Sequence, residues 1–421
     1  MAFRDHLDSV PRVSDEISCI HGILEHSNAV EHAPFVATSI LEAPSHSVAA
    51  NILSRDRLCA VLGINPGELI DILGEAMDNR SDPSIVENGP VFDCKQSAPM
   101  LTKLPIPWHY PNDRGRYMSA SIVIAEYGGQ RNVSFHRQFV RDDGHVVARL
   151  VPRHLRTMVD TARNAGEEIP IAIVNGADPV VLLAAAMSFN EAIDELTVAS
   201  SLHEKFYGRP LELVKLPNGI VVPADSEYAM SAFITCDDDL EAPYVDITGT
   251  LDDERMEPVF RITEIYHRKN PIFHALIPAL SEHITLMGLP RAPTIKSAVS
   301  EVVECHDVHM TVGGCGWLSS VISITPKNPD DGKKAIHAAF NGHKSMKMVT
   351  VVNQDIDVAN SARVEWALMT RWQPDVDTVI LSKQKGSSLD PSRGDDGLTA
   401  KIGYDATLDP NSDPGPFTSV L

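Results

Sequence analysis

The sequence predicts an α/β (α+β) protein of three domains whose middle domain is barrel-like. Between residues 117 and 267, many short apolar or β-branched runs are broken by turn residues, with a few helical segments inserted among them. Beyond residue 290, strand and helix patterns alternate, which is typical of an α/β domain with a largely parallel sheet. We therefore predict an N-terminal α/β domain, the middle domain and a C-terminal α/β domain, at residues 1–102, 103–290 and 291–421.

The first domain shows short helical patterns and ends in a proline-rich loop at residues 104–113. Asn65-Pro66 predicts a helix start, because Asn caps free backbone N–H groups and Pro suits the first helical position. The middle domain opens with a strand at 119–126 and a polar strand over Arg131–Arg137. Asp143-Gly144 is a hairpin signal that joins this strand to a partner at 146–151.

A helix is expected over Arg153–Asn164, closed near Gly166. Asp178-Pro179 predicts a second helix start, and a further helical pattern covers 190–202. The remaining strands are expected at 171–174, 211–215, 220–222, 228–236, 244–248 and 258–267. In the last domain we expect strands at 311–325, 346–352 and 377–381, with helices at 331–340 and 358–369.

The composition limits the classes of partner. The chain has 421 residues with 36 Lys and Arg against 57 Asp and Glu, for a net charge of -21. This balance argues against nucleic acid or an anionic membrane as the main partner. An anionic substrate then requires a local cationic pocket, and the candidates are Arg131, His136, Arg137, Arg149 and Arg153.

The cysteines and apolar runs predict a soluble cytoplasmic protein. The six cysteines are scattered without a Cys-x-x-Cys pair, which favours free thiols in a reducing compartment. No secretory signal is visible at the N-terminus. The most apolar run, residues 180–189, is too short to span a bilayer.

Polar residues interrupt the middle domain in two further places. Glu227 closes the segment from Val222 and leads into an apolar strand. With the Asn132 amide and the His154 imidazole, its carboxylate would form an oxygen and nitrogen ligand set that suits Mn²⁺ or Mg²⁺. A surface Glu and a buried Asn on a polar sheet face would explain the same residues.

The second place is Glu264-Ile-Tyr-His-Arg268. Alternation puts Glu264 on one strand face, where it could hold Arg137 in a bidentate pair and so position a carboxylate clamp. His267 or His274 could donate a proton near neutral pH. An edge strand with a charged face is the alternative.

Taken together, five segments resemble the UbiD family of decarboxylases that use prenylated FMN. They are residues 132–137, 176–179, 222–227, 264–268 and 401–407, in the family's order. The resemblance implies a central split β-barrel that binds the flavin and a C-terminal α/β domain that supports oligomerisation. It also implies a homo-oligomer, a dimer or a hexamer, and a flavin prenyltransferase as cofactor supplier.

The resemblance assigns roles by matched position. Asn132, His154 and Glu227 would hold a Mn²⁺ at the cofactor phosphate, with K⁺ nearby. The residues at the prenylated flavin would be Ser134, Phe135, His136, Arg137, Arg153, His154 and Lys401. Arg137 would also bind the substrate carboxylate, with Glu264 as its partner. Many members carry a second acid five residues after that Glu; Lys269 stands there instead, which leaves His267, Lys269 and His274 as alternative proton donors.

The implied reaction is reversible, non-oxidative removal of CO₂ from an α,β-unsaturated or aromatic acid, with the protein supplying position, electrostatics and protons. The chain is most similar to the archaeal branch, which makes conversion of trans-anhydromevalonate 5-phosphate to isopentenyl phosphate the leading hypothesis. A decarboxylase of a 4-hydroxybenzoate-type acid is the second. A flavin- or metal-binding protein without turnover is the alternative from another class.

Overall fold

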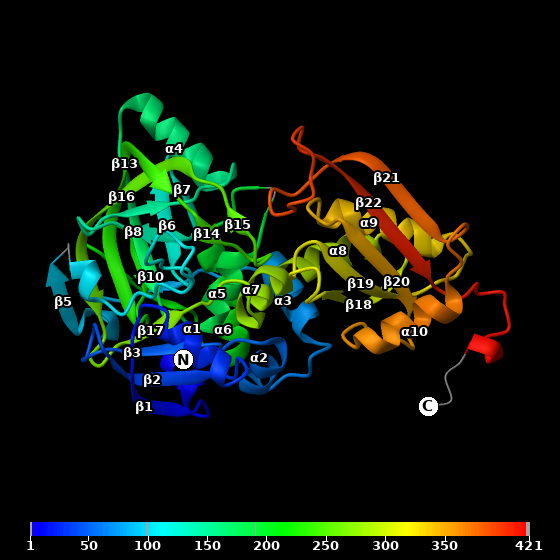
Figure 1. Cartoon of the computed structure of the whole chain (residues 1–421), viewed down its shortest axis with the longest axis horizontal. Helices are drawn as coiled ribbons and strands as arrows, with labels where there is room; N and C mark the ends of the chain where they lie inside the picture. The colour runs from blue at the N-terminus through cyan, green and yellow to red at the C-terminus, as the bar shows by residue number, and fades with distance from the viewer. Residues whose placement is uncertain (1, 98–99, 190, 418–421) are drawn as a thin grey trace. The chain divides into compact units, whose positions relative to one another are not determined.

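The computed structural model describes residues 2–97, 100–189 and 191–417. The chain forms two compact units (Figure 1). The first unit comprises residues 1–63 and 76–283, and the second comprises residues 64–75 and 284–421. Most of the first two predicted domains thus lies within one unit, with residues 64–75 and 284–290 in the other, and a boundary between them near residue 102 stays a prediction.

The first unit is built on an eight-stranded sheet in which every pairing is antiparallel. The order is β7-β6-β10-β13-β16-β9-β8, and β5 also pairs with β16. The strands are β5 (Cys94–Ser97), β6 (Ile122–Tyr127), β7 (Gln130–Phe135), β8 (Gln138–Val140), β9 (Val146–Ala148), β10 (Ile169–Asn175), β13 (Tyr228–Glu241) and β16 (Arg255–His267).

The Asp143-Gly144 turn forms as predicted, but it joins different strands. Gly144 takes the left-handed conformation with φ of 81°, and the turn connects β8 to β9. The Arg131–Arg137 strand is β7, which pairs with β6 instead. The chain breaks its strand between Phe135 and Gln138, so Arg137 lies at a corner between two strands.

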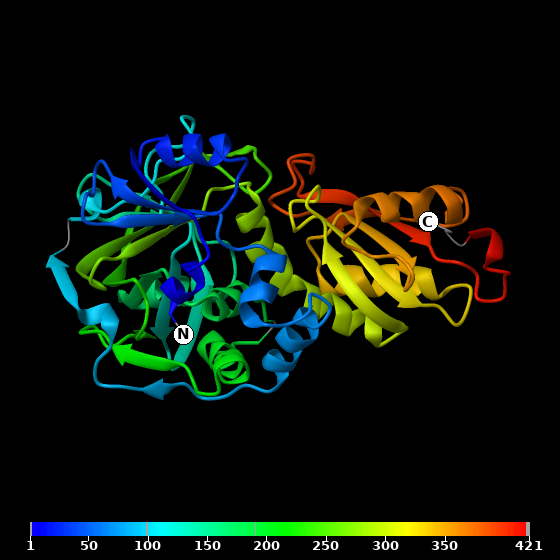
Figure 2. The ribbon, with the colours of Figure 1, turned by 90° about the horizontal axis from the view of Figure 1, so that it is seen from below.

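A smaller four-stranded sheet packs on the large one. Its order is β1-β2-β3-β17, and its strands are β1 (Arg12–Ile17), β2 (Phe35–Ile40), β3 (Ser47–Ala50) and β17 (Ile272–Ala275). Figure 2 shows the ribbon of the smaller sheet beside that of the large one. One hydrophobic core includes residues of both sheets, such as Phe35 and Ile171. Because β17 follows β16 in the chain but pairs with β3, the N-terminal and middle segments fold together.

Two further small sheets complete the strands of this unit: β12 (Val221–Pro223) with β11 (Glu212–Lys215) and β4 (Ser84–Ile85), and β14 (Tyr244–Val245) with β15 (Leu251–Asp252). Its helices are η1 (Phe3–Leu7), α1 (Gly22–Ala29), α2 (Arg55–Leu62), η2 (Pro90–Phe92), η3 (Met100–Lys103), α4 (His154–Ala165), α5 (Pro179–Ala186) and α6 (Glu195–Tyr207). Two helices, α3 (Leu69–Asp78) and α7 (Ser281–Gly288), are divided between the units.

The predicted helix signals are confirmed in the middle segment. The Asp178 side chain accepts a hydrogen bond from the Val180 amide at 2.9 Å and so caps α5. Gly166 ends α4 with φ of 72°. The pattern at 190–202 begins later than predicted, at Glu195, and α6 continues to Tyr207.

The second unit contains a mixed five-stranded sheet, β18-β19-β20-β22-β21. Both inner pairings are parallel and both edge strands are antiparallel, so the prediction of a largely parallel sheet holds only for its centre. The elements are β18 (Glu304–Met310), β19 (Ser319–Thr325), β20 (Met348–Asn353), β21 (Thr378–Lys385), β22 (Leu398–Ala406), η4 (Leu289–Arg291), α8 (Ala292–Ser300), α9 (Asp331–Gly342), α10 (Ser361–Arg371) and η5 (Gly415–Phe417).

Helices cover both faces of this sheet. Side chains alternate along β22: an added Cβ at Gly403 would collide with Ile336 of α9, whereas Ala406 belongs to the core beneath α10. The glycine of the 401–407 segment thus allows α9 to approach the strand closely.

Two expectations about the chain as a whole are addressed by the structure. All six cysteines are free. Among the described residues, none of the helices has the length and apolar character that crossing a bilayer would require.

Candidate active site

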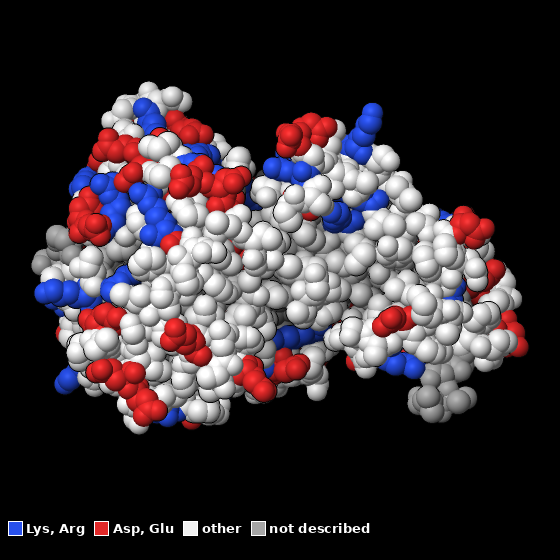
Figure 3. Space-filling model, viewed as in Figure 1, with Lys and Arg blue, Asp and Glu red and all other residues white. Residues whose placement is uncertain are grey.

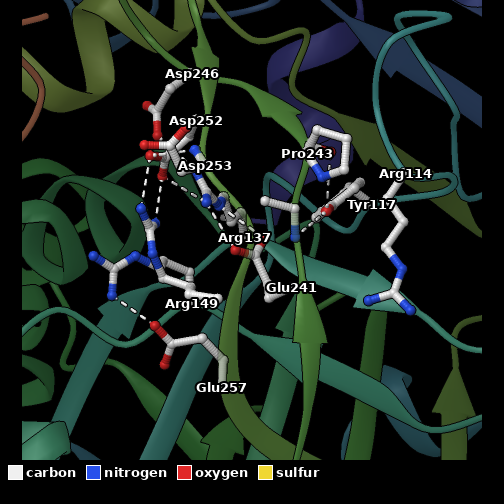
Figure 4. A network of polar contacts seen from close by, with 12 residues as sticks. Arg114, Tyr117, Arg137, Arg149, Glu241, Pro243, Asp246, Asp252, Asp253 and Glu257 are labelled. Carbon is white, nitrogen blue, oxygen red and sulfur yellow. Dashed lines mark hydrogen bonds and ion pairs between the residues drawn. The ribbon is translucent and has the colours of Figure 1, made fainter.

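Arg137 is the centre of a buried network of charges (Figure 4). Its Nε and Nη2 donate to the two carboxylate oxygens of Glu241 at 2.9 and 2.8 Å. Nη1 donates to Asp246 at 2.7 Å, and Nη2 also donates to Asp252 at 2.7 Å. The Arg137 side chain is only 7% exposed and Glu241 is fully buried, whereas Asp246 and Asp252 are 20% and 25% exposed. Two of the three carboxylates thus face partly outward.

The three acids come from one excursion between β13 and β16. Glu241, the last residue of β13, lies opposite Arg255, the first residue of β16. Between them Tyr244 lies opposite Asp252 in the β14–β15 pair. A tight turn starts at Asp246, whose backbone N–H donates to the Thr250 carbonyl at 3.0 Å. The antiparallel register therefore brings the acids together around one guanidinium.

The Tyr244 ring packs against the Arg137 guanidinium. The Arg137 guanidinium carbon lies 4.8 Å from the centre of the Tyr244 ring, a cation–π distance. Tyr244 in turn contacts Tyr117 and is hydrogen-bonded to the Ser119 hydroxyl at 2.8 Å. Burial alone would lower the pKa of Arg137, but the Glu241 hydrogen bond and the neighbouring carboxylates raise it overall. The group stays cationic.

The predicted pairing of Arg137 with Glu264 is wrong. Glu264 accepts hydrogen bonds from Lys95 and from the Tyr266 hydroxyl, both at 2.5 Å. The Lys95 hydrogen bond, and then that of Tyr266, lowers the pKa of Glu264. Glu264 lies nine residues beyond Arg255 on the same strand, which is roughly 30 Å at about 3.3 Å per residue.

The predicted proton donors lie at that same distant end. His267 is the last residue of β16 and is held by Gln96 at 2.9 Å and by the Arg268 carbonyl. Lys269 is exposed in the following turn. His274 is fully buried and lies 2.9 Å from the Glu282 carboxylate. The register of β16 therefore places His267 and Lys269 far from Arg137, and the prediction that these residues act beside it is corrected.

A second polar cluster surrounds Asn132 on β7. Its amide nitrogen donates to a Glu195 carboxylate oxygen at 3.1 Å, and the Val133 amide donates to the other oxygen at 2.7 Å. Glu195 is 4% exposed, and no Lys or Arg of the described chain forms an ion pair with it. Burial raises the pKa of Glu195 to about 8. This is a buried carboxylate without a counter-charge.

Proton counting leaves one acceptor without a proton in this cluster, either the Asn132 amide oxygen or His136 Nε2. Burial lowers the pKa of His136 to about 4, so the ring is neutral and has one N–H. If Nδ1 donates to the Arg149 carbonyl at 2.9 Å, Nε2 is an acceptor. The single hydroxyl proton of Ser134 then lies between His136 and the Asn132 oxygen, each 2.9 Å away. One of the two acceptors lacks a proton.

Glu227 does not lie in this cluster, which corrects the predicted ligand set. It is fully buried, and both its oxygens accept from the Arg4 guanidinium at 2.8 and 2.7 Å. The Ile272 amide donates to it as well. Its Cβ packs on Gly176, where an added Cβ would lie 2.6 Å away and where φ is +68°. Glu227 is therefore neutralised by Arg4.

Of the four arginines in the predicted cationic pocket, Arg153 is the one without a carboxylate partner within the described ranges. Arg131 pairs with Glu126 and Asp194, and Arg149 pairs with Glu257. Arg153 immediately precedes α4, makes no side-chain capping hydrogen bond to it, and donates to the Ser188 hydroxyl at 2.8 Å. On the face drawn in Figure 3, acidic and basic side chains are mixed near α4, β13 and β16.

Three other predicted cofactor residues, His154, Phe135 and Lys401, lie in three different elements. His154 is the first residue of α4 and is partly buried. Phe135 ends β7 and is also partly buried. Lys401 belongs to the second unit, where its ammonium donates to the Lys344 carbonyl at 2.5 Å and lies 5.1 Å from the Phe340 ring centre.

Sequence reasoning missed Glu241, Asp246, Asp252 and Glu195. A signal for the first two was present, because Asp246 stands five residues after Glu241, the spacing expected of the family's two acids. Glu195 follows a helix-capping Asp, and nothing local distinguishes it from an ordinary acid in a first helical turn.

Comparison with known proteins gives a consistent result over most of the chain. Residues 84–281 match the family model described as the 3-octaprenyl-4-hydroxybenzoate carboxy-lyase Rift-related domain, UbiD. Residues 284–406 match the C-terminal domain of the same carboxy-lyase.

Named relatives and solved structures agree with these matches. The chain is 40% identical to the anhydromevalonate phosphate decarboxylase of Methanosarcina mazei, over 86% of this chain and 84% of that protein. It is 37% identical to the enzyme of that name from Methanocaldococcus jannaschii, over 86% of each. The UbiD-class enzyme HmfF from Pelotomaculum thermopropionicum, solved with FMN, superposes with a TM-score of 0.95 at 30% identity, over 100% of this chain and 97% of that one. An evolved dimeric form of HmfF with prFMN gives a TM-score of 0.89 at 30% identity, over 100% and 99%.

Proposed function

Because the chain belongs to the UbiD family of carboxy-lyases, we propose that it decarboxylates trans-anhydromevalonate 5-phosphate to isopentenyl phosphate with prenylated FMN as cofactor. The vinylic carboxylate leaves as CO₂, and one proton replaces it on the same carbon. The names of the archaeal relatives support this substrate, and the FMN and prFMN complexes of HmfF support the cofactor.

The observation that carries the proposal is the set of Arg137, Glu241 and Asp246. Glu241 takes one edge of the guanidinium with both oxygens, which fixes its plane. The terminal edge then points toward the partly exposed acids. A substrate carboxylate that binds this edge is oriented by a rigid, charged donor pair.

Each residue of the set has a separate task. Arg137 binds the substrate carboxylate. This interaction weakens as neutral CO₂ forms, because the negative charge of the carboxylate disappears. Asp246, which is 20% exposed, takes up a proton from solvent and delivers it to the carbon that lost CO₂, which returns Asp246 to its carboxylate form. Glu241 keeps Arg137 in place throughout. When bound, the flavin supplies the electron sink for the cleaved bond.

The Asn132–Glu195 cluster fits a divalent cation such as Mn²⁺. The Glu195 carboxylate, whose pKa is raised by burial, and the Asn132 amide oxygen are hard oxygen ligands of the kind that such an ion prefers. We assign Asn132 and Glu195 as ligands, with His154 as the third. In this assignment Glu195 replaces the Glu227 of the sequence-based prediction, and K⁺ stays a prediction.

Arg153 and Ser188 fit the cofactor phosphate. The Arg153 side chain is exposed and its guanidinium donates to the Ser188 hydroxyl, with no carboxylate partner in the described chain, and desolvation lowers its pKa. A phosphate at the start of α4 would supply the missing negative charge. The flavin contacts of Ser134, Phe135, His136 and Lys401 stay predictions, as do a homo-oligomer, a cytoplasmic location and a flavin prenyltransferase partner.

The test is turnover by protein co-produced with a flavin prenyltransferase. Isopentenyl phosphate and CO₂ should form from trans-anhydromevalonate 5-phosphate, and 4-hydroxybenzoate should release little CO₂. Arg137→Gln should abolish release. Arg141→Gln removes the same charge from the neighbouring hairpin, where Arg141 pairs with Asp143 and Asp239. This variant should retain CO₂ release. Protein that carries prenylated FMN but releases no CO₂ from the phosphorylated acid would contradict the proposal.

A further inference from the structure

Four of the five N–H groups of Arg137 are already donated to protein carboxylates. The Nε/Nη2 edge is taken by Glu241. The terminal Nη1/Nη2 edge is taken by Asp246 on one nitrogen and by Asp252 on the other. A carboxylate clamp needs two parallel N–H groups on one edge. A substrate carboxylate therefore has to displace a protein carboxylate from the terminal edge.

Asp252 is the acid that has a second cationic partner. Arg255 holds it with Nη1 to one oxygen at 2.6 Å and Nη2 to the other at 2.9 Å. Asp246 has no second cation among its ion pairs in the described chain, and Glu241 is fully buried. The Arg255 hydrogen bond, acting against burial, lowers the pKa of Asp252, so the acid is ionised. Asp252 can release Arg137 without losing its charge partner.

The charges around the terminal edge oppose an incoming anion. Arg137 and Arg255 contribute two positive charges, and Glu241, Asp246 and Asp252 contribute three negative ones when ionised. An added carboxylate increases the negative excess unless one acid withdraws. The side chains of Asp252 and Arg255 are 25% and 28% exposed, so this pair has solvent beside it and room to shift.

We propose that Asp252 is a placeholder carboxylate: it occupies the substrate-carboxylate position on Arg137 in the empty site and is withdrawn onto Arg255 when substrate binds. This inference rests on the proposed role of Arg137 as the carboxylate-binding group. Asp252 acts through Arg137 and is a positioning residue. It keeps the guanidinium oriented before substrate arrives and sets how strongly a carboxylate must compete to enter.

The test compares Asp252→Asn with Asp253→Asn, which removes the same charge from the exposed neighbouring residue (Figure 4). The backbone amide of Asp253 donates to the Asp252 carboxylate, and the Asp253 side chain has no ion pair within the described residues. Two readouts are needed in the cofactor-loaded enzyme. The first is kcat and KM for trans-anhydromevalonate 5-phosphate. The second is the Kd, by calorimetry, of the saturated analogue, which carries the same carboxylate and phosphate but has no double bond and cannot react.

Removal of the competing charge should lower KM and Kd about two- to fivefold in Asp252→Asn while kcat stays near wild type. Arg255→Gln should raise both constants, because Asp252 then stays on Arg137. If Asp252 only stabilised the hairpin, its substitution would weaken binding of the analogue. A rise in Kd for Asp252→Asn therefore overturns the inference. An equal effect of Asp253→Asn overturns it too, since that would be a general charge effect. If wild type neither binds the analogue nor releases CO₂, the proposed function itself fails.

Discussion

The Asn132 amide nitrogen lies 3.1 Å from a Glu195 carboxylate oxygen, although 63 residues separate the two in the chain. Strand β7 carries the amide, and the first turn of α6 carries the acid. The packing of α6 against β7 thus creates a buried carboxylate whose partners are neutral N–H groups. Such a group is stable either protonated or beside a cation.

The first prediction concerns which acid binds metal. Glu195→Gln should weaken Mn²⁺ binding on the order of tenfold or more, because the anionic ligand is lost. Glu227→Gln should leave the affinity for Mn²⁺ near wild type, since Arg4 neutralises Glu227. Metal content after dialysis against known Mn²⁺ concentrations measures both. Loss of metal only in Glu227→Gln would restore the original ligand assignment.

The second prediction concerns pH. Burial raises the pKa of Glu195 from an ordinary 4.5 to about 8, so between these values the folded protein binds a proton that the unfolded chain does not. The stability of the metal-free protein should therefore fall as pH rises from 5 to 8, by at most about 1.4 kcal/mol per pH unit from this group.

Denaturant unfolding of the metal-free protein at several pH values measures this slope. Glu195→Gln does not titrate and should reduce the slope, and Mn²⁺ should reverse it by replacing the proton. A slope that is identical in wild type and Glu195→Gln would show that other groups cause the pH dependence.

The third prediction concerns the acid that positions Arg137. Glu241→Gln loses the bidentate charge partner of a guanidinium that is 7% exposed, and turnover should fall by about a hundredfold. Glu264→Gln should retain turnover, because Glu264 is bonded to Lys95 and Tyr266 on a distant part of β16. Single-turnover CO₂ release with cofactor content held equal is the measurement. The opposite ranking of the two variants would return Glu264 to the catalytic set.

Local signals in the sequence predicted the helices and strands well where one residue carries the physical cause. Asp178 caps α5 through its own carboxylate, and Gly166 ends α4 through its own backbone conformation. Pairing depends on partners elsewhere in the chain. The turn at Asp143-Gly144 was therefore predictable, whereas the choice of β8 over β7 as its first strand was not.

The candidate site shows the same limit. Arg137 could be identified from its polar surroundings, but its acid could not, because Glu241 and Glu264 both lie in or near apolar strands. The register of β13 on β16 decides between them by placing Glu241 opposite Arg255. Glu195 needed the packing of α6 on β7, which no spacing in the sequence encodes.

The last prediction concerns the acid that the structure removes from the metal site. Arg4 is 28% exposed, but it is the partner of a fully buried carboxylate, so Arg4→Gln leaves Glu227 charged and poorly compensated. The free energy of unfolding should fall by roughly 2 to 3 kcal/mol. Arg12→Gln, on the exposed start of β1, is the matched control and should change it little. The double change Arg4→Gln with Glu227→Gln should recover much of the loss, because no charge is then buried. Equal losses in the single and double variants would mean that the loss comes from other contacts of Arg4, such as those with the Lys269 and Asn270 carbonyls, and not from an uncompensated Glu227.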